Sequence, residues 1–262
     1  MHDPNSWQNK FHPYTLTHLC VVLVFVALVV GMVLMRRSDA VADDPPLRRK
    51  MDRVIGWICL AGACFVQLVT LWPSRFDYRA SLPLHICDIV MFVAPLALLL
   101  HWRSLRTIAY FWGLGLSSIS FIYPDLWFGP AHFQFWVFWT GHACIVGAAL
   151  YDITGCGYRP KWHDYRFIAW FSILYVAILL PIDARFHLNY GYIGKTYGGQ
   201  RSPTDFLGVW PWRVPLMLLM GLGVMFGLLL PWVIRHKIAA KNLEAKQEAG
   251  GPAPQEVHSG VR

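Results

Sequence analysis

The feature that most constrains this chain is a series of apolar runs, each close to the length that a helix needs to cross a lipid bilayer. The plainest run, Leu19 to Met35, contains no charged residue. A transmembrane helix needs about 20 mostly apolar residues. Because 56% of the residues are hydrophobic and only 15% are charged, the chain has more apolar surface than a soluble core requires. We therefore predict a multi-pass protein of the cell membrane.

We expect an all-α fold, a bundle of seven transmembrane helices that forms one domain over residues 1–235. A basic and polar cytoplasmic tail over residues 236–262 is expected to be disordered beyond one helical extension. The fourth helix carries Gly113, Gly115 and three serines, and small residues let helices pack closely in lipid, so we expect it near the centre. The helices are expected at roughly 15–35, 54–72, 84–100, 106–123, 132–152, 166–184 and 213–234.

The charges in the loops predict the orientation of the bundle. Sixteen Lys and Arg residues fall in the loops and tail on one side of the seven spans, and seven fall on the other side. Because cytoplasmic loops carry the excess of positive charge, the N-terminus is expected outside and the C-terminus in the cytoplasm. The same bias explains the net charge of +8. We therefore expect membrane lipid, and no nucleic acid, as a partner.

The octapeptide Leu82–Ile89 concentrates reactive groups at the start of the third predicted helix. His85, Cys87 and Asp88 bring an imidazole, a thiol and a carboxylate into four positions. Ionisable residues in spans are rare and usually face a cavity or a partner. The dipole at a helix N-terminus favours a thiolate, and a nearby imidazole can accept the thiol proton. Cys87 is therefore a candidate nucleophile.

The base for Cys87 is expected on another helix. Helical geometry turns Cys87 roughly 160° away from His85, whereas His85 and Asp88 share a face. His142 lies ten residues into the fifth predicted helix, roughly 15 Å below His132. Such a deeply placed imidazole needs a partner, so His142 or His132 is the better candidate. Asp88 either orients an imidazole or opposes the thiolate by its charge, and the sequence does not decide between these roles.

Further polar and aromatic residues fall on the predicted outer face. Tyrosines and tryptophans there also suit an aromatic belt at the membrane surface. The candidates for substrate binding are Asp125, His132, Asn189, Tyr190 and Trp210. A metal site is the rival hypothesis for His85, Asp88, Asp125, His132 and His142. No two of these histidines have a usual ligand spacing, so we expect neither a metal nor another cofactor.

Several motifs, in order, resemble the YwaF-type bacterial integral membrane proteins over roughly residues 50–235. They are LPLHICD at 82–88, YFWGLG at 110–115, YPDL at 123–126, HFQFW at 132–136, GH at 141–142, GYRP at 157–160, NYGY at 189–192 and LGVWPW at 207–212. That group is similar, more distantly, to the transmembrane protein 164 family of acyltransferases. The resemblance implies a seven-span enzyme that moves acyl chains between phospholipids through a cysteine, which falls on Cys87, and a histidine, which falls on His142. The relatives carry histidine directly after the cysteine, where this chain has Asp88.

Three functions remain open on the sequence. The first is a lipid acyltransferase or transacylase at the outer leaflet, in which Cys87 attacks a phospholipid ester, His142 acts as base and then acid, and Asp88 or His85 orients groups. The alternative is a non-enzymatic binder or transporter of a small or lipidic ligand. The third is a scaffold that contacts a partner, or a second copy in a homodimer, through the GxxxG pair Gly223 and Gly227.

Overall fold

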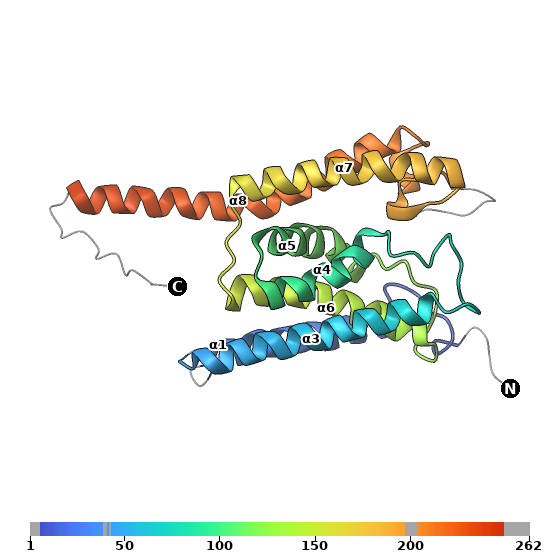
Figure 1. The fold of residues 1–262 in the computed structure, drawn as a ribbon, viewed down its shortest axis with the longest axis horizontal. Helices are drawn as coiled ribbons and strands as arrows, with labels where there is room; N and C mark the ends of the chain where they lie inside the picture. Colours follow the sequence, from blue (N-terminus) through green and yellow to red (C-terminus); the bar gives the residue numbers. More distant parts are fainter. Residues whose placement is uncertain (1–5, 39–40, 42, 197–203, 249–262) are drawn as a thin grey trace.

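The computed structural model describes residues 6–38, 41, 43–196 and 204–248, and all regular secondary structure in these ranges is helical (Figure 1). The predicted all-α class is confirmed. Apart from the helices, an isolated antiparallel bridge joins Lys10 to Phe128. This bridge ties the N-terminal segment to the loop that precedes the helix with His142, so these two segments lie at the same end of the molecule.

Within the described ranges, five helices are long and apolar enough to cross a membrane. The structure therefore agrees with the predicted multi-pass membrane protein. The five helices are α1 (Leu16–Arg37), α3 (Pro45–Thr70), α6 (Phe133–Gly155), α7 (Trp162–Phe186) and α8 (Arg213–Glu248). Helix α8 includes the predicted helical extension beyond residue 235, whereas residues 249–262 of the predicted tail lie outside the described residues.

The other two predicted spans are present as shorter or irregular helices. Helix α4 (Ile86–Leu100) has only 15 residues. The fourth predicted helix begins as α5 (Arg103–Ile108), continues as a π-helix over Ala109–Leu116 and ends as a 3-10 helix over Ser117–Phe121. By length and composition, five helices in the part of the chain that the structure describes, rather than seven, meet the requirement for a span. The count of seven and the orientation therefore stay predictions.

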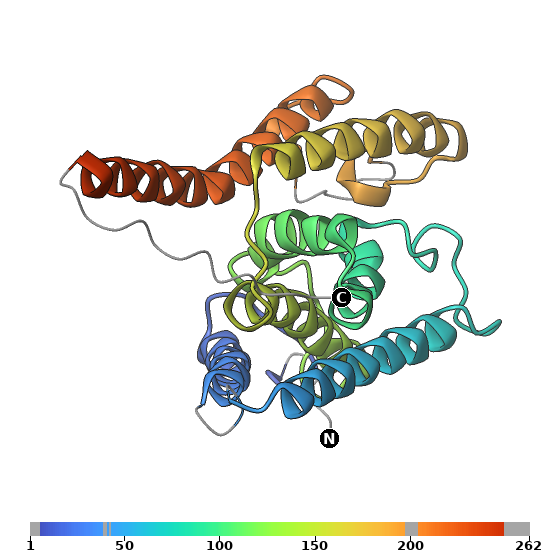
Figure 2. The ribbon, with the colours of Figure 1, turned by 60° about the vertical axis from the view of Figure 1, so that its left-hand side comes forward.

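The helices form three layers (Figure 1), and a second view shows the same arrangement (Figure 2). Helices α7 and α8 form one layer, α4, α5 and α6 form the middle layer, and α1 and α3 form the third. The main core lies in the middle layer, where Phe111 and Trp112 are fully buried. A side chain at Gly113 would come within 3.2 Å of Ile145 and Val90. Glycine there allows the irregular helix to pack centrally, as its small residues predicted.

Ion pairs connect the helices at the end of the bundle where α4 and α6 terminate. Arg106 on α5 binds Asp152 on α6 with a shortest distance of 2.8 Å. Arg103 binds Asp164 on α7 at 2.6 Å. Because the buried carboxylates sit on different helices, these pairs fix α5 against both α6 and α7.

The GxxxG pair of α8 does not pack against the rest of the described chain. A methyl group added at Gly223 or Gly227 would meet no described atom within 4 Å. By contrast, a side chain at Gly221 would touch Leu116. The pair therefore faces away from the bundle, and the homodimer through it stays a prediction.

Candidate functional site

The candidate site is built around the loop that leads into α4, at the right-hand end of the bundle in Figure 1. His85 is the N-cap of α4 and has an extended backbone, with φ −67° and ψ 151°. Its backbone N–H donates to Asp88 Oδ2 at 3.2 Å. The backbone N–H of an N-cap residue has no partner within the helix. A carboxylate at the third helical position can reach back and accept its hydrogen bond. Asp88 therefore fixes the turn that presents Cys87.

The imidazole of His85 lies between two tyrosines of the NYGY motif. Its ring centroid is 5.1 Å from that of Tyr190 and 5.2 Å from that of Tyr192. The backbone N–H of Gly191 donates to His85 Nδ1 at 3.2 Å. Burial lowers the pKa of His85 to about 4. The ring is thus neutral at pH 7, and because Nδ1 accepts a hydrogen bond, its proton lies on Nε2.

The backbone conformation of the NYGY turn requires its glycine. Gly191 has φ +63°, in the left-handed region that favours glycine. A side chain there would also come within 2.5 Å of the Tyr175 hydroxyl. That hydroxyl donates to the Leu84 carbonyl at 2.7 Å, immediately before His85. Gly191 therefore lets the loop approach both α7 and the start of α4.

Hydrogen bonds join the loops that the sequence assigned to one face. The Tyr190 hydroxyl donates to the Tyr78 carbonyl at 2.9 Å and accepts from the Leu82 N–H at 3.1 Å. The Tyr192 hydroxyl donates to Asp125 Oδ2 at 3.1 Å. Burial, together with the nearby Asp125 charge, raises the pKa of Tyr192, which keeps this phenol protonated as a donor. Segments more than 60 residues apart in the sequence therefore converge around His85.

Cys87 lies one residue inside α4 and is half-buried. Its Sγ is 3.9 Å from Asp88 Oδ1, within reach of a weak S–H hydrogen bond to the carboxylate. A neighbouring negative charge disfavours a thiolate. The resting thiol is therefore protonated, and any nucleophilic role needs a separate base.

His142 is buried in α6, with 6% of its surface exposed. Its Nδ1 lies 2.8 Å from the Phe138 carbonyl oxygen on the preceding turn. Because a carbonyl only accepts, Nδ1 carries the proton and Nε2 of the neutral ring has a free lone pair. The Phe138 ring packs on the imidazole with centroids 4.4 Å apart. This tautomer suits a base that acts through Nε2.

The remaining predicted residues lie around this cluster to different degrees. The Trp210 indole N–H donates to the Ile193 carbonyl at 3.0 Å, which ties the LGVWPW motif to the NYGY turn. Asn189 precedes that turn, and its side-chain oxygen is buried without a hydrogen-bond partner among the described residues. His132 is the N-cap of α6 and packs on Phe128, in the loop that pairs with the N-terminal segment. The contacts of His132 are thus with a segment other than the loops around His85.

Sequence reasoning missed two contributors to the cluster. Tyr175 and Tyr192 contact the start of α4 through the hydrogen bond and ring packing described above. The sequence did point to Tyr192, because it belongs to the NYGY motif. It did not point to Tyr175, since a tyrosine inside an apolar span resembles any packing residue.

One group of side chains in the described part of the chain has the composition of a metal site. Ligand atoms of Asp52, His101 and Cys156 lie within 4.8 Å of one another. These residues lie at the opposite end of the bundle from Cys87, because His101 is the C-cap of α4. They are therefore not part of the candidate site.

Comparison with known proteins gives one family. The profile of the TMEM164 family matches residues 13–229, which include every predicted site residue. Comparison with curated proteins gave no match, and comparison with solved structures gave none either.

Proposed function

This chain belongs to the TMEM164 family, and from this premise we propose that it is a membrane lipid acyltransferase or transacylase with Cys87 as nucleophile and His142 as base. We assign the reaction to the outer leaflet of the cell membrane, in line with the orientation predicted from loop charge. Within the family, the motifs at residues 82–88 and 189–192 favour the YwaF-type bacterial branch.

The observation that carries the proposal is the packing of α4 on α6 beside the two residues. A side chain at Gly141 would come within 2.8 Å of Met91 Cε, so these two positions face each other. Met91 follows Cys87 by four residues, which puts both on one face of α4, about 6 Å apart along its axis. His142 follows Gly141 directly. Because adjacent residues of a helix project about 100° apart, this packing supports neighbouring backbone positions for Cys87 and His142 on two packed helices, and the proposed chemistry requires their side chains to meet between them.

The proposed first half-reaction forms a thioester. His142 Nε2 accepts the Cys87 proton as Sγ attacks the carbonyl carbon of a phospholipid ester. The tetrahedral intermediate then breaks its C–O bond, and the imidazolium gives its proton to the departing lysophospholipid oxygen, which becomes a hydroxyl. The acyl chain is left on Sγ, and the base is neutral again.

The second half-reaction transfers the acyl chain to an acceptor. The hydroxyl of another lysophospholipid gives its proton to His142 Nε2 and attacks the thioester carbonyl carbon. The C–S bond breaks, and the Cys87 sulfur takes the proton back. No cofactor is needed, because one ester bond replaces another.

The outer cluster would bind and orient the substrate. His85 carries a proton on Nε2 and is neutral, so it can donate to a phosphate or ester oxygen without a change of charge. Asp88 holds the turn that presents the thiol, and the aromatic loop around Tyr190 covers that turn. We assign Asp125, His132, Asn189 and Trp210 to the rim that contacts the lipid headgroup.

The test is an acyl-exchange assay with the full-length protein in lipid nanodiscs, a phospholipid with a labelled acyl chain and an unlabelled lysophospholipid. We expect Cys87→Ser and His142→Ala each to lower the exchange rate at least about 100-fold, because each removes a group that takes part in the reaction. The matched controls are Cys64→Ser and His163→Ala, which change exposed residues away from the cluster.

The thioester itself gives a second readout. The wild-type protein should retain label that hydroxylamine releases, and Cys87→Ser should not. If Cys87→Ser exchanges acyl chains at the wild-type rate, the proposed chemistry is wrong. Specific lipid binding that survives both substitutions without exchange would favour the non-enzymatic binder.

A further inference from the structure

A cavity of about 290 Å³ lies at the end of the bundle opposite the candidate site, where α1 and α6 end and α3 begins. The 15 residues of α4 separate the two ends by about 22 Å. Three arginines, an aspartate, a histidine and a cysteine dominate the lining: Arg36, Arg48, Arg49, Asp52, His101 and Cys156. The proposed acyl transfer uses none of them.

Two of these charges neutralise each other. Arg36 Nε binds Asp52 Oδ1 at 3.1 Å, and both side chains are less than one-tenth exposed. The Tyr151 hydroxyl donates to the same Oδ1 at 2.6 Å. The stem of Arg36 occupies the space beside Gly155, where a side chain would come within 2.7 Å of Arg36 Cγ. Arg36 and Asp52 therefore form a fixed wall with no net charge.

The other two arginines supply uncompensated positive charge. Arg48 is half-buried and Arg49 is exposed, both in the first turns of α3. Neither guanidinium forms an ion pair or a hydrogen bond with any residue in the described ranges. Because the charges of Arg36 and Asp52 cancel, Arg48 and Arg49 give the lining of the cavity a charge of about +2.

We propose that this cavity binds the phosphate group of an anionic phospholipid. The planar guanidinium of arginine matches phosphate oxygens through paired N–H donors. Basic pockets between membrane helices at the positively charged side of a bundle suit acidic lipid headgroups. The wall of Arg36 and Asp52 gives the site a fixed shape, and Arg48 and Arg49 provide the charge. Because the site lies a full helix away from Cys87, the bound lipid is a structural or regulatory ligand and not the acyl donor.

A metal ion is the competing occupant, because Asp52, His101 and Cys156 converge within 4.8 Å. Two observations favour phosphate. The Asp52 carboxylate already binds Arg36 and Tyr151. A divalent cation would also sit in a cavity lined by three guanidinium groups, which repel it.

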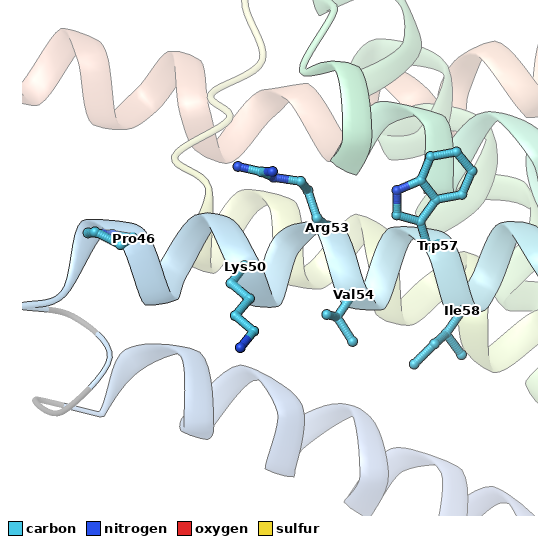
Figure 3. A pocket seen from close by; sticks show the side chains of 6 residues that line it. All are labelled: Pro46, Lys50, Arg53, Val54, Trp57 and Ile58. Carbon is cyan, nitrogen blue, oxygen red and sulfur yellow. The ribbon is translucent and has the colours of Figure 1, made fainter.

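The neighbouring face of α3 provides a matched control. A second groove of about 360 Å³ runs along this face, and Figure 3 shows the side chains that line it. Lys50 and Arg53 are its charged residues, and Trp57 and Ile58 continue it as an exposed apolar surface. Removing these two charges changes the net charge of the same helix end by the same amount, but it leaves the cavity intact.

The experiment titrates the full-length protein in detergent with phosphatidic acid and follows its thermal unfolding midpoint. Parallel titrations use phosphatidylcholine, inorganic phosphate and Zn²⁺. We expect Arg48→Gln/Arg49→Gln to weaken phosphatidic acid binding roughly 30-fold, from the usual contribution of two basic residues to anionic lipid binding. Lys50→Gln/Arg53→Gln should weaken it less than about threefold, because its charges lie outside the cavity. An affinity for phosphatidic acid well above that for inorganic phosphate identifies a lipid as the source of the bound phosphate group. Equal affinities identify free phosphate as the ligand.

Three outcomes would overturn the proposal. Equal losses in the two double variants would mean that lipid binds the helix end by general attraction. Equal affinity for phosphatidylcholine would remove the role of the anionic charge. Stabilisation by Zn²⁺ that Cys156→Ser abolishes would assign the cavity to a metal. None of these readouts depends on acyl exchange, so they leave the proposed function unaffected.

Discussion

At the scale of single residues, His85 links the start of α4 to the NYGY turn more than 100 positions later. Its Nδ1 must be unprotonated to accept the Gly191 N–H, and its ring lies between two tyrosines. Protonation of the ring would break the hydrogen bond and place a charge in this buried setting. The neutral form of His85 therefore stabilises the loop that covers the candidate site.

This contact predicts a loss of stability in mild acid. The pKa of His85 is about 4 in the folded protein, against an ordinary value of 6.5. Between these values the unfolded chain binds a proton that the folded chain does not, so stability present above pH 6.5 is lost as the pH falls toward 4. The loss is up to roughly 3 kcal/mol from this group. The measurement is the unfolding midpoint in detergent between pH 7.5 and 4.5.

The matched variant is His85→Gln, which removes the titrating group but keeps a polar side chain at the N-cap. Its unfolding midpoint should start lower at pH 7.5 and fall less with acid than that of the wild type. Identical pH profiles for the two proteins would mean that His85 contributes nothing to the acid sensitivity.

At the scale of elements, buried ion pairs hold the short, irregular helix of the middle layer in place. Arg106 makes three hydrogen bonds to the Asp152 carboxylate, at 2.8 to 3.1 Å, and a fourth to the Cys156 carbonyl. Only 4% of the Asp152 side chain is exposed. In lipid, a helix of six residues that continues as a π-helix has little hydrophobic driving force to choose its neighbours. Directional polar contacts therefore specify its position.

Removing one partner of this ion pair should destabilise the protein more than removing both partners. Arg106→Gln leaves the Asp152 carboxylate buried without its cation, which costs about 3–5 kcal/mol. The double variant Arg106→Gln/Asp152→Asn removes both charges and should recover much of that loss. Unfolding midpoints in one detergent at pH 7.5 give the comparison. A double variant no more stable than Arg106→Gln would contradict this account.

At the scale of the whole molecule, polar chemistry gathers at the two ends of an otherwise apolar body. One end holds Cys87 and the aromatic loops, and the other holds the ion pairs and the basic cavity. The bridge between Lys10 and Phe128 puts the N-terminal segment at the first end, and α8 carries the chain past the second. The two ends should therefore face opposite sides of the membrane, with the thiol end outside.

Labelling with a membrane-impermeant maleimide tests that orientation. Tyr78→Cys introduces a thiol in the exposed loop before α4, and Lys237→Cys introduces one on the exposed part of α8. In intact cells we expect only Tyr78→Cys to be labelled above the wild-type background, and after permeabilisation both should react. Labelling of Lys237→Cys in intact cells would reverse the predicted orientation and move the proposed reaction to the inner leaflet.

The sequence by itself determined the membrane class, the helical fold and the end at which the candidate nucleophile lies. Hydropathy is a local property, so a run such as Leu19 to Met35 indicates a membrane helix whatever its neighbours are. The position of Cys87 beside Pro83 and His85 likewise indicates a helix start. The lengths of the apolar runs could not decide how many of them cross the membrane, because α4 and the segment after it are helical but short or irregular.

Only the tertiary structure decided which faces of the helices meet. Spans that are apolar on all sides do not show in their sequence which face packs inward. The contact of Tyr175 with the start of α4 and the approach of Gly141 to Met91 therefore had no sequence signal. The ring of His85 meets a turn 106 positions away, and such pairings arise only when packing brings distant segments together. The same holds for the basic cavity, whose walls come from the ends of four helices.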